Sequence, residues 1–196
     1  MPLADPNAPL PRRILFHGVT GTGKSSAAAR LSALSGIPWH SADDDIGWLP
    51  AEEARWTNRP PEEMLWIAKD ICAQDEWILD SAYSLFIEPV MERVELVIAL
   101  DYPRHISFLR LLRRTAQRVR DRRPVCNGNI ETLRQTFSKD SILLWHLRTF
   151  TRKKSQARSW AADPDGPQVL AFSRPEELDQ WLTRATRTNP EESQRP

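Results

Sequence analysis

The sequence predicts a single α/β domain in which a parallel β-sheet is covered by helices on both faces. Short apolar runs alternate with longer segments of helical pattern along the chain, which is typical of such domains. The 196 residues suffice for one domain of ordinary size with its own core. No internal repeat and no linker divides the chain, so one core is expected.

The first expected strand and helix flank a glycine-rich turn. Residues 13–17 are mostly apolar and predict a strand that runs into this turn. Residues 24–35 are rich in alanine and predict a helix, which Gly36 is suited to end. A second, short strand is expected over residues 37–40.

Prolines mark the start of the following helices. Pro61 with Glu62 and Glu63 predicts a helix through about residue 74, because proline fits the first turn and acidic side chains there favour the helix dipole. Pro103 begins a long helix, and residues 174–184 form the last one. The remaining strands are expected at residues 76–80, 95–101 and 168–172.

Composition and the chain ends limit the class of protein. The longest aliphatic run, residues 96–100, is far shorter than the ~20 residues that span a bilayer. The first ten residues lack the pattern of a signal peptide, and two cysteines make no disulfide framework. We therefore expect a cytoplasmic protein without membrane contact. Residues 1–12, rich in proline, are expected to be a disordered arm, residues 188–196 a frayed tail, and residues 13–187 the domain.

The glycine-rich turn carries the strongest functional signal. Residues 18–25 match the phosphate-binding pattern GxxxxGK[ST] at every fixed position, between an expected strand and an expected helix. The glycines allow the backbone N–H groups to turn toward phosphate oxygens, and the helix that follows points its positive end at the anion. Lys24 is suited to contact the β- and γ-phosphates of ATP, and the Ser25 hydroxyl to bind Mg²⁺.

Acidic residues stand where the expected strands end, and ligands of parallel sheets lie beyond these ends. Asp80 is our candidate for holding Mg²⁺ directly or through water, and Asp44 for contacting the phosphoryl acceptor or acting as its base. Asp43 and Asp45 fit a solvated turn as well as a functional role. For Asp101, next to Tyr102-Pro103, a helix N-cap is favoured over a functional role.

Positive charge is concentrated between residues 104 and 158, which hold 15 Lys and Arg against three acids. Arg110, Arg114 and Arg118 are four residues apart and form a ridge on the expected helix, whose other face is formed by Phe108, Leu112, Thr115 and Val119. Arginine stabilises charge in phosphoryl transfer, so Arg114 and Arg118 are candidate catalytic residues, although a solvated helix face fits each of them equally well. The helix break that follows indicates a lid around residues 114–130.

Taken together, several blocks resemble the adenylate-kinase-related P-loop proteins known as topology modulation proteins. The blocks are the phosphate loop, residues 40–48, residues 77–83 and residues 100–103 with Arg110, Arg113 and Arg114, within a similarity that spans residues 14–181. The resemblance implies a P-loop kinase-like three-layer sandwich with a five-stranded parallel sheet in the order 2-3-1-4-5 and a helical lid that bears arginines.

The same resemblance implies site residues. ATP would be bound by Gly18, Val19, Thr20, Gly21, Thr22, Gly23, Lys24, Ser25 and Ser26, with Arg174 near the adenine. Asp80 would occupy the Walker B position, and Arg114 and Arg118 would lie near the lid. Ser81-Ala82-Tyr83 follow Asp80 without the arginine that adenylate kinases have there, so AMP is not expected as the acceptor.

Two functions are consistent with these residues. The first is an ATP- and Mg²⁺-dependent kinase that moves the γ-phosphate to an unidentified small-molecule acceptor, nucleotide-like or hydroxyl, held near Asp44 and Tyr83. The second is a regulatory NTPase in which ATP binding switches a partner contact, or whose basic segment contacts DNA. No recognition-helix motif is evident, and arginines near a lid serve transfer chemistry, so the kinase is favoured. The oligomeric state is left open.

Overall fold

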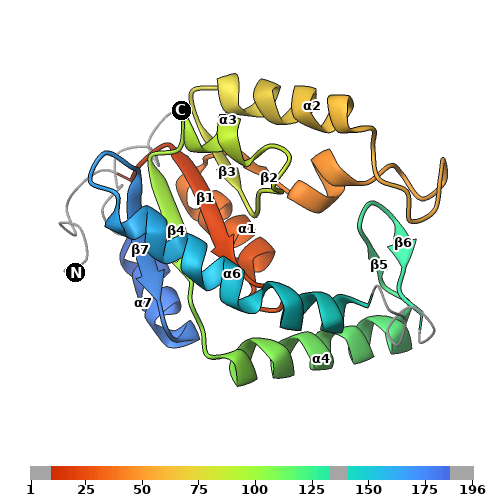
Figure 1. The fold of residues 1–196 in the computed structure, drawn as a ribbon. Helices are drawn as coiled ribbons and strands as arrows, with labels where there is room; N and C mark the ends of the chain where they lie inside the picture. Colours follow the sequence, from red (N-terminus) through yellow and green to blue (C-terminus); the bar gives the residue numbers. More distant parts are fainter. Residues whose placement is uncertain (1–9, 133–140, 186–196) are drawn as a thin grey trace, which may run out of the picture.

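The core of the computed structural model is a five-stranded parallel sheet in the order β2-β3-β1-β4-β7 (Figure 1). The structure describes residues 10–132 and 141–185. The strands are β1 (Arg13–Gly18), β2 (Trp39–His40), β3 (Trp77–Leu79), β4 (Leu96–Leu100) and β7 (Gln168–Phe172). Each predicted strand is present, and the predicted order 2-3-1-4-5 is confirmed, because β7 is the fifth strand of this sheet. Of the arm expected at residues 1–12, residues 1–9 lie outside the described residues, as does the tail at residues 188–196, whereas Leu10 packs against the core and the Arg12 N–H donates to the Glu95 carboxylate at 2.8 Å.

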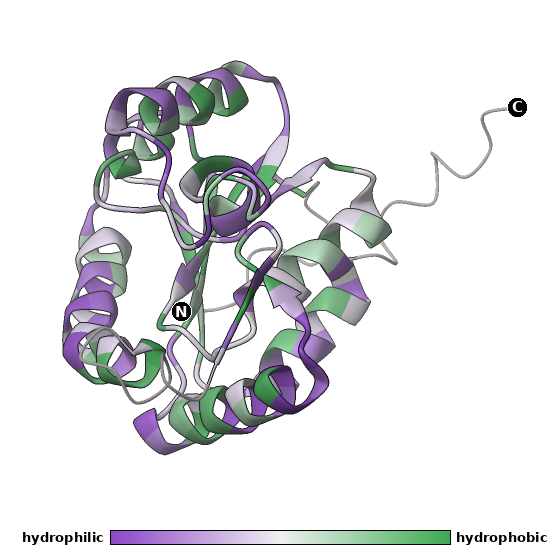
Figure 2. Ribbon diagram, turned by 90° about the vertical axis from the view of Figure 1, so that its right-hand side faces the viewer, coloured by the Kyte–Doolittle hydropathy of each residue, from purple (hydrophilic) through white to green (hydrophobic). Residues whose placement is uncertain are grey.

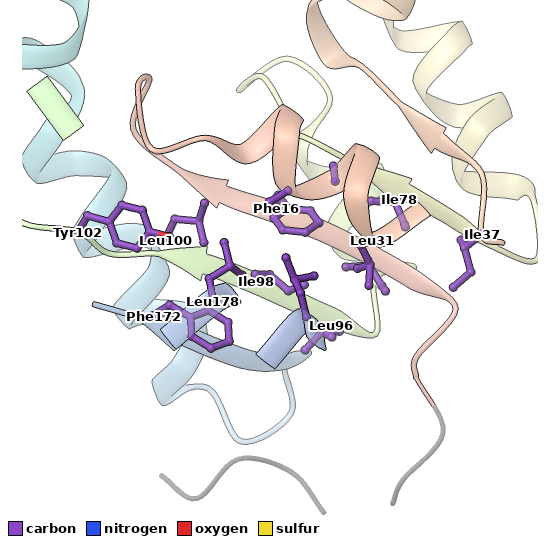
Figure 3. Close-up of a cluster of buried hydrophobic side chains, with 14 residues drawn as sticks. Phe16, Leu31, Ile37, Ile78, Leu96, Ile98, Leu100, Tyr102, Phe172 and Leu178 are labelled. Atoms are coloured by element: carbon purple, nitrogen blue, oxygen red, sulfur yellow. The ribbon is translucent and has the colours of Figure 1, made fainter. Parts of the chain in front are cut away.

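Helices cover both faces of the sheet and make three layers. On one face, α1 (Lys24–Ser35) and α7 (Pro175–Ala185) pack on a buried cluster that includes Phe16, Ile98 and Phe172 (Figure 3). On the other face, α2 (Pro61–Ala73), α3 (Ile87–Met91) and α6 (Ile142–Ala162) enclose a second cluster around Leu15 and Val97. Because successive side chains of a strand point to opposite faces, β1 contributes to both clusters.

Helix ends follow the signals in the sequence. Gly36 ends α1 in the left-handed conformation with φ 78°, and α2 begins at Pro61 with two acids in its first turn. The long helix α4 (Arg104–Asp121) begins directly after Pro103, which occupies its N-cap position. The N-cap role expected for Asp101 is therefore wrong. The Asp101 carboxylate instead lies 2.9 Å from the Lys154 ammonium of α6.

Three short elements were not predicted. A π-helix, η1 (Ala42–Gly47), holds the three consecutive aspartates after β2, and α3 follows β3. Beyond α4, a two-stranded hairpin is formed by β5 (Pro124–Val125) and β6 (Asn129–Ile130), where the sequence showed only turn residues. Residues 114–130, where a lid is expected, form the end of α4 and this hairpin, and their role as a lid stays a prediction.

The buried face of α4 differs from the expected one. Ser107, Leu111 and Thr115 are buried, whereas Leu112 of the expected apolar face is 43% exposed. Figure 2 shows hydrophilic (purple) and hydrophobic (green) residues alternating along the outer helices. The Ser107 backbone and Leu111 pack against the glycine-rich loop, as described below, and the Ser107 hydroxyl lies 2.9 Å from the His146 Nε2 of α6. No helix in the described part of the chain is long and apolar enough to cross a membrane.

Candidate active site

The glycine-rich loop joins β1 to α1 and is closed by bonds to one carbonyl oxygen. The Val19 carbonyl accepts hydrogen bonds from the Thr22 hydroxyl at 2.9 Å and from the Lys24 ammonium at 3.0 Å. Gly23 is the N-cap of α1 with φ 94°, and no side chain caps the helix. The first N–H groups of α1 therefore have no side-chain acceptor, which suits an anion at this end.

Gly21 is required where the loop meets α4. Its φ is 85°, and a Cβ atom built on it would overlap the Ser107 carbonyl oxygen and lie 2.8 Å from the Leu111 Cβ. A side chain at this position would push α4 away from the loop. The close contact fixes the helix that carries Arg110, Arg114 and Arg118 against the phosphate-binding loop.

Lys24 lies among charges of both signs. Burial lowers the pKa of its ammonium from 10.5 to about 8, while the nearby carboxylates of Asp80 and Asp43 act to raise it. Lys153 and Arg114 add to the lowering, so the surroundings of Lys24 hold several cations. Such an excess of positive charge is suited to a polyphosphate.

Asp80 follows β3 and lies at the floor of the site. The side chain is 4% exposed, its Oδ1 accepts a hydrogen bond from the Ala42 N–H at 2.9 Å, and the Ser25 hydroxyl is a second donor. Burial raises the pKa of the Asp80 carboxyl despite these donors and Lys24. A buried carboxylate beside a hydroxyl is a donor set of hard oxygens that suits Mg²⁺. Within the described residues no group of three or more His, Cys, Asp or Glu could hold a metal ion, so water and phosphate oxygens would complete the coordination.

The sequence did not decide whether Asp43 lies in a solvated turn or has a functional role, and the structure brings it next to the other site residues. The Tyr83 hydroxyl donates a hydrogen bond to its Oδ1, and its charge acts on Lys24, Asp80 and Arg114. Burial first, and then the Asp43 carboxylate, raise the pKa of Tyr83, so the phenol stays protonated and remains a donor. The η1 helix turns Asp43 toward the loop, and this turn is what the sequence pattern did not reveal.

Asp44 has a different environment from Asp43. Its Oδ1 accepts a hydrogen bond from the Asn127 N–H of the hairpin at 2.6 Å, and its Oδ2 accepts one from the Ser41 hydroxyl at 3.2 Å. The segment that follows η1 makes a second bond to the hairpin: the Ala51 N–H donates to the Asn127 carbonyl at 2.9 Å. Asp44 therefore joins η1 to the hairpin, and these contacts favour Asp43 over Asp44 as the carboxylate that faces the loop.

The two candidate catalytic arginines are placed differently. The Arg114 guanidinium lies 3.4 Å from the Thr20 hydroxyl of the loop, and its buried Nε has no hydrogen-bond partner in the described part of the chain. Burial lowers the pKa of Arg114, and Arg118 lowers it further. Arg118 forms an ion pair of 3.5 Å with Glu131, next to the hairpin. An unsatisfied buried donor beside the loop marks Arg114 as the arginine suited to a phosphate.

Arg174 lies just after β7, at the same edge of the sheet as the loop. Its side chain is exposed, and its backbone N–H donates to the Glu177 carboxylate at 3.1 Å, which closes the first turn of α7. Ser26, in the first turn of α1, is also exposed. Their expected contacts with ATP remain predictions.

We compared the chain with protein families, curated proteins and solved structures. No protein-family model matches the chain, and no curated protein matches it. A gluconokinase from Sinorhizobium meliloti 1021 superimposes with a TM-score of 0.52 at 15% identity, over 92% of this chain and 93% of that one. Shikimate kinase from Acinetobacter baumannii, in complex with shikimate, superimposes with a TM-score of 0.53 at 12% identity, over 88% and 89%.

This chain has the P-loop kinase fold. The likeness extends over nearly the whole length of both structures. At such low identity it concerns the fold alone. In that fold the phosphate-binding loop follows the central strand, as residues 18–25 follow β1 here.

Proposed function

We propose that the protein is an ATP-dependent phosphotransferase that moves the γ-phosphate of ATP to a small-molecule acceptor. The observation that carries this proposal is the convergence of Lys24, Arg114, Asp43 and Asp80 at one end of the sheet, where their charges act on one another. Cations for the phosphates, a carboxylate for the metal and a carboxylate for the acceptor are the parts that phosphoryl transfer needs.

The loop and two cations would hold the triphosphate. The N–H groups of residues 18–25 and the uncapped start of α1 would bind phosphate oxygens, and Lys24 would exchange its bond to the Val19 carbonyl for one to phosphate. Arg114 would donate from its unsatisfied guanidinium and stabilise the charge of the migrating group. Arg118 is left to orient the hairpin through Glu131.

The buried Asp80 carboxylate and the exposed Ser25 hydroxyl beside it would hold Mg²⁺. When bound, the ion supplies positive charge to the β- and γ-phosphate oxygens. The protein fixes the Asp80 carboxylate for this role through the Ala42 N–H, which belongs to η1. The same peptide segment therefore positions both Asp80 and Asp43.

Asp43 would accept the proton of the acceptor hydroxyl. The Tyr83 hydroxyl bonds to one carboxylate oxygen, and the other would receive the proton. Asp44, our first candidate for this role, would keep the hairpin on η1 instead. Membership of the topology modulation proteins is part of this proposal and is supported by the sequence blocks described above. A cytoplasmic location is also part of the proposal.

Direct measurement of phosphoryl transfer tests the proposal. With radiolabelled ATP and Mg²⁺, a panel of polyols, hydroxy acids, nucleosides and nucleotides should contain acceptors that become labelled, and Lys24→Met should abolish the labelling. Retention of the fold in Lys24→Met is checked by circular dichroism. Tight ATP binding without transfer to any acceptor would contradict the kinase and favour the regulatory alternative.

A further inference from the structure

A groove of about 480 Å³ lies between α6 and the segment that follows β3. Ala82 and Ser84 line one side, and they stand two and four residues after Asp80. Arg152 and Lys153 of α6 line the other side. The groove therefore opens beside the residues to which the phosphotransferase role assigns the metal and the acceptor hydroxyl.

The charge in this groove is positive and uncompensated. Arg152 and Lys153 contribute two cations, and none of the residues that line the groove is acidic. The neighbouring Lys154 pairs with Asp101, whereas no acid pairs with Lys153 among the residues that the structure describes. Burial lowers the pKa of Lys153, and Arg152 lowers it further, so the ammonium lacks the counter-ion that burial calls for.

Lys153 is held in place and lies near the phosphate-binding loop. The His17 Nε2 lies 2.9 Å from the Lys153 carbonyl oxygen, which ties this turn of α6 to β1. Burial lowers the pKa of His17 to about 3, so the ring is neutral and Nε2 carries the hydrogen that the carbonyl accepts. Trp160 packs edge-on against the same ring at 4.7 Å. Lys153 also lines a small cavity together with Gly18 and Val19 of the loop, and its charge acts on Lys24.

We propose that this groove binds the phosphoryl acceptor and that the acceptor is an anion, a hydroxylated carboxylate or phosphate held by Lys153 and Arg152. Ser84 and Gln156 offer partners for hydroxyl groups, and Ile87 and Trp160 provide apolar contacts for a carbon skeleton. The inference rests on the proposed phosphotransferase function and specifies its substrate class.

Matched sets of probes test the charge requirement and separate the two sources of the anion. Each set shares one skeleton: glycerol, glycerate and glycerol 3-phosphate; galactitol, galactonate and galactitol 1-phosphate; adenosine and AMP. We expect one anionic member to bind, by calorimetry without ATP, at least tenfold more tightly than its neutral counterpart. Preference for carboxylates or for phosphates identifies the anion. Equal binding of neutral and anionic members, or no binding of any anion at millimolar concentration, overturns the inference.

Two variants assign the effect to the groove. Lys153→Met and Arg152→Met should each weaken binding of the preferred anion at least tenfold and raise its KM, and in Arg152→Met the Kd for ATP should change less than twofold. Arg152 is exposed and its loss does not threaten the fold, and Lys69→Met, on the exposed face of α2, is the matched control that should leave anion binding unchanged. A large change in the Kd for ATP with unchanged anion binding would assign Lys153 to the nucleotide and overturn the inference.

The outcomes separate this inference from the function on which it rests. Labelling of neutral acceptors, at rates that Lys153→Met does not change, refutes the anion site and leaves the kinase intact. Anion binding that depends on Lys153, without transfer from ATP, refutes the kinase and supports the site.

Discussion

The Lys24 ammonium donates a hydrogen bond to the Val19 carbonyl oxygen, five residues earlier in the same loop, at 3.0 Å. The lysine thus closes the loop on itself, in surroundings that lower its pKa to about 8. A neutral carbonyl offsets little of the cost of burying a charge. A bound polyphosphate would supply the negative charge that this carbonyl does not, and would thereby stabilise the Lys24 ammonium.

Removing that charge should stabilise the protein without ligand. The folded-state pKa of Lys24 lies below its ordinary value of 10.5, so folding disfavours the protonated form at neutral pH. We expect Lys24→Met to raise the free energy of unfolding by roughly 1–3 kcal/mol at pH 7, and the gain to disappear as the pH rises from about 8 toward 10.5, where the folded wild-type lysine is neutral. Urea titrations at pH 7 and pH 10 measure this. A variant less stable than wild type at pH 7 would contradict it.

The affinity for ATP should depend on pH through the same group. Phosphate oxygens bind the ammonium form of Lys24, which is half populated near pH 8 in the free protein. We expect the Kd for ATP to be nearly constant from pH 6.8 to 7.5 and to rise as the pH passes about 8, with uptake of protons on binding. Calorimetry in buffers of different ionisation enthalpy counts these protons. Binding without proton uptake at pH 8.5 would show that Lys24 does not titrate there.

Variants of the adjacent residues Asp43 and Asp44 should distinguish the chemical step from the docking of the hairpin on η1. Asp43→Asn removes the proposed base and is expected to lower kcat by about 10²–10⁴ with little change in the Kd for ATP. Asp44→Asn weakens the bond to the Asn127 N–H and should increase hydrogen exchange in the hairpin while kcat falls far less. A larger loss of kcat in Asp44→Asn than in Asp43→Asn would return the base role to Asp44.

Sequence patterns predicted the strands and the phosphate loop because each depends on local signals, whereas the strand order was implied by the resemblance to topology modulation proteins. β1 and β4 are apolar runs, and Gly36 and Pro103 mark helix boundaries that the structure confirms. These signals act within a few residues, where propensity and turn chemistry decide the conformation.

Long-range contacts account for what the sequence did not predict. Three consecutive aspartates look alike in the sequence, and only the turn of η1 directs Asp43 to Tyr83 and Asp44 to Asn127. The buried face of α4 was misjudged for a similar reason. Its partners there are the loop backbone at Gly21, which meets the Ser107 carbonyl and the Leu111 Cβ, and His146 of α6, whose Nε2 lies 2.9 Å from the Ser107 hydroxyl.

Gly21 and Gly36 have similar backbone conformations and offer a matched test of the loop–helix contact. Their φ angles are 85° and 78°, but a Cβ on Gly36 would meet nothing within 4 Å, whereas one on Gly21 would overlap the Ser107 carbonyl. We expect Gly36→Ala to cost about 1 kcal/mol of unfolding free energy, the strain of a left-handed alanine. Gly21→Ala should cost about 3 kcal/mol or more and abolish ATP binding, because α4 must move. Equal losses in urea titrations would show that the contact with α4 contributes nothing.

Arg114 and Arg118, one turn apart on α4, should differ in their effect on catalysis. Arg114 carries a buried, unpaired Nε beside the loop, while Arg118 is paired with Glu131. Arg114→Met should lower kcat by about 10³ or more, because it removes the guanidinium beside Thr20 that would stabilise the migrating phosphate. Its effect on stability should be small, because burial disfavours the Arg114 charge while the carboxylates of Glu131 and Asp43 favour it. Arg118→Met leaves Glu131 unpaired and is expected to lower the melting temperature and to change kcat less than tenfold. Steady-state kinetics with thermal unfolding of the two variants measures both effects, and a greater loss of kcat in Arg118→Met would place Arg118 at the phosphate.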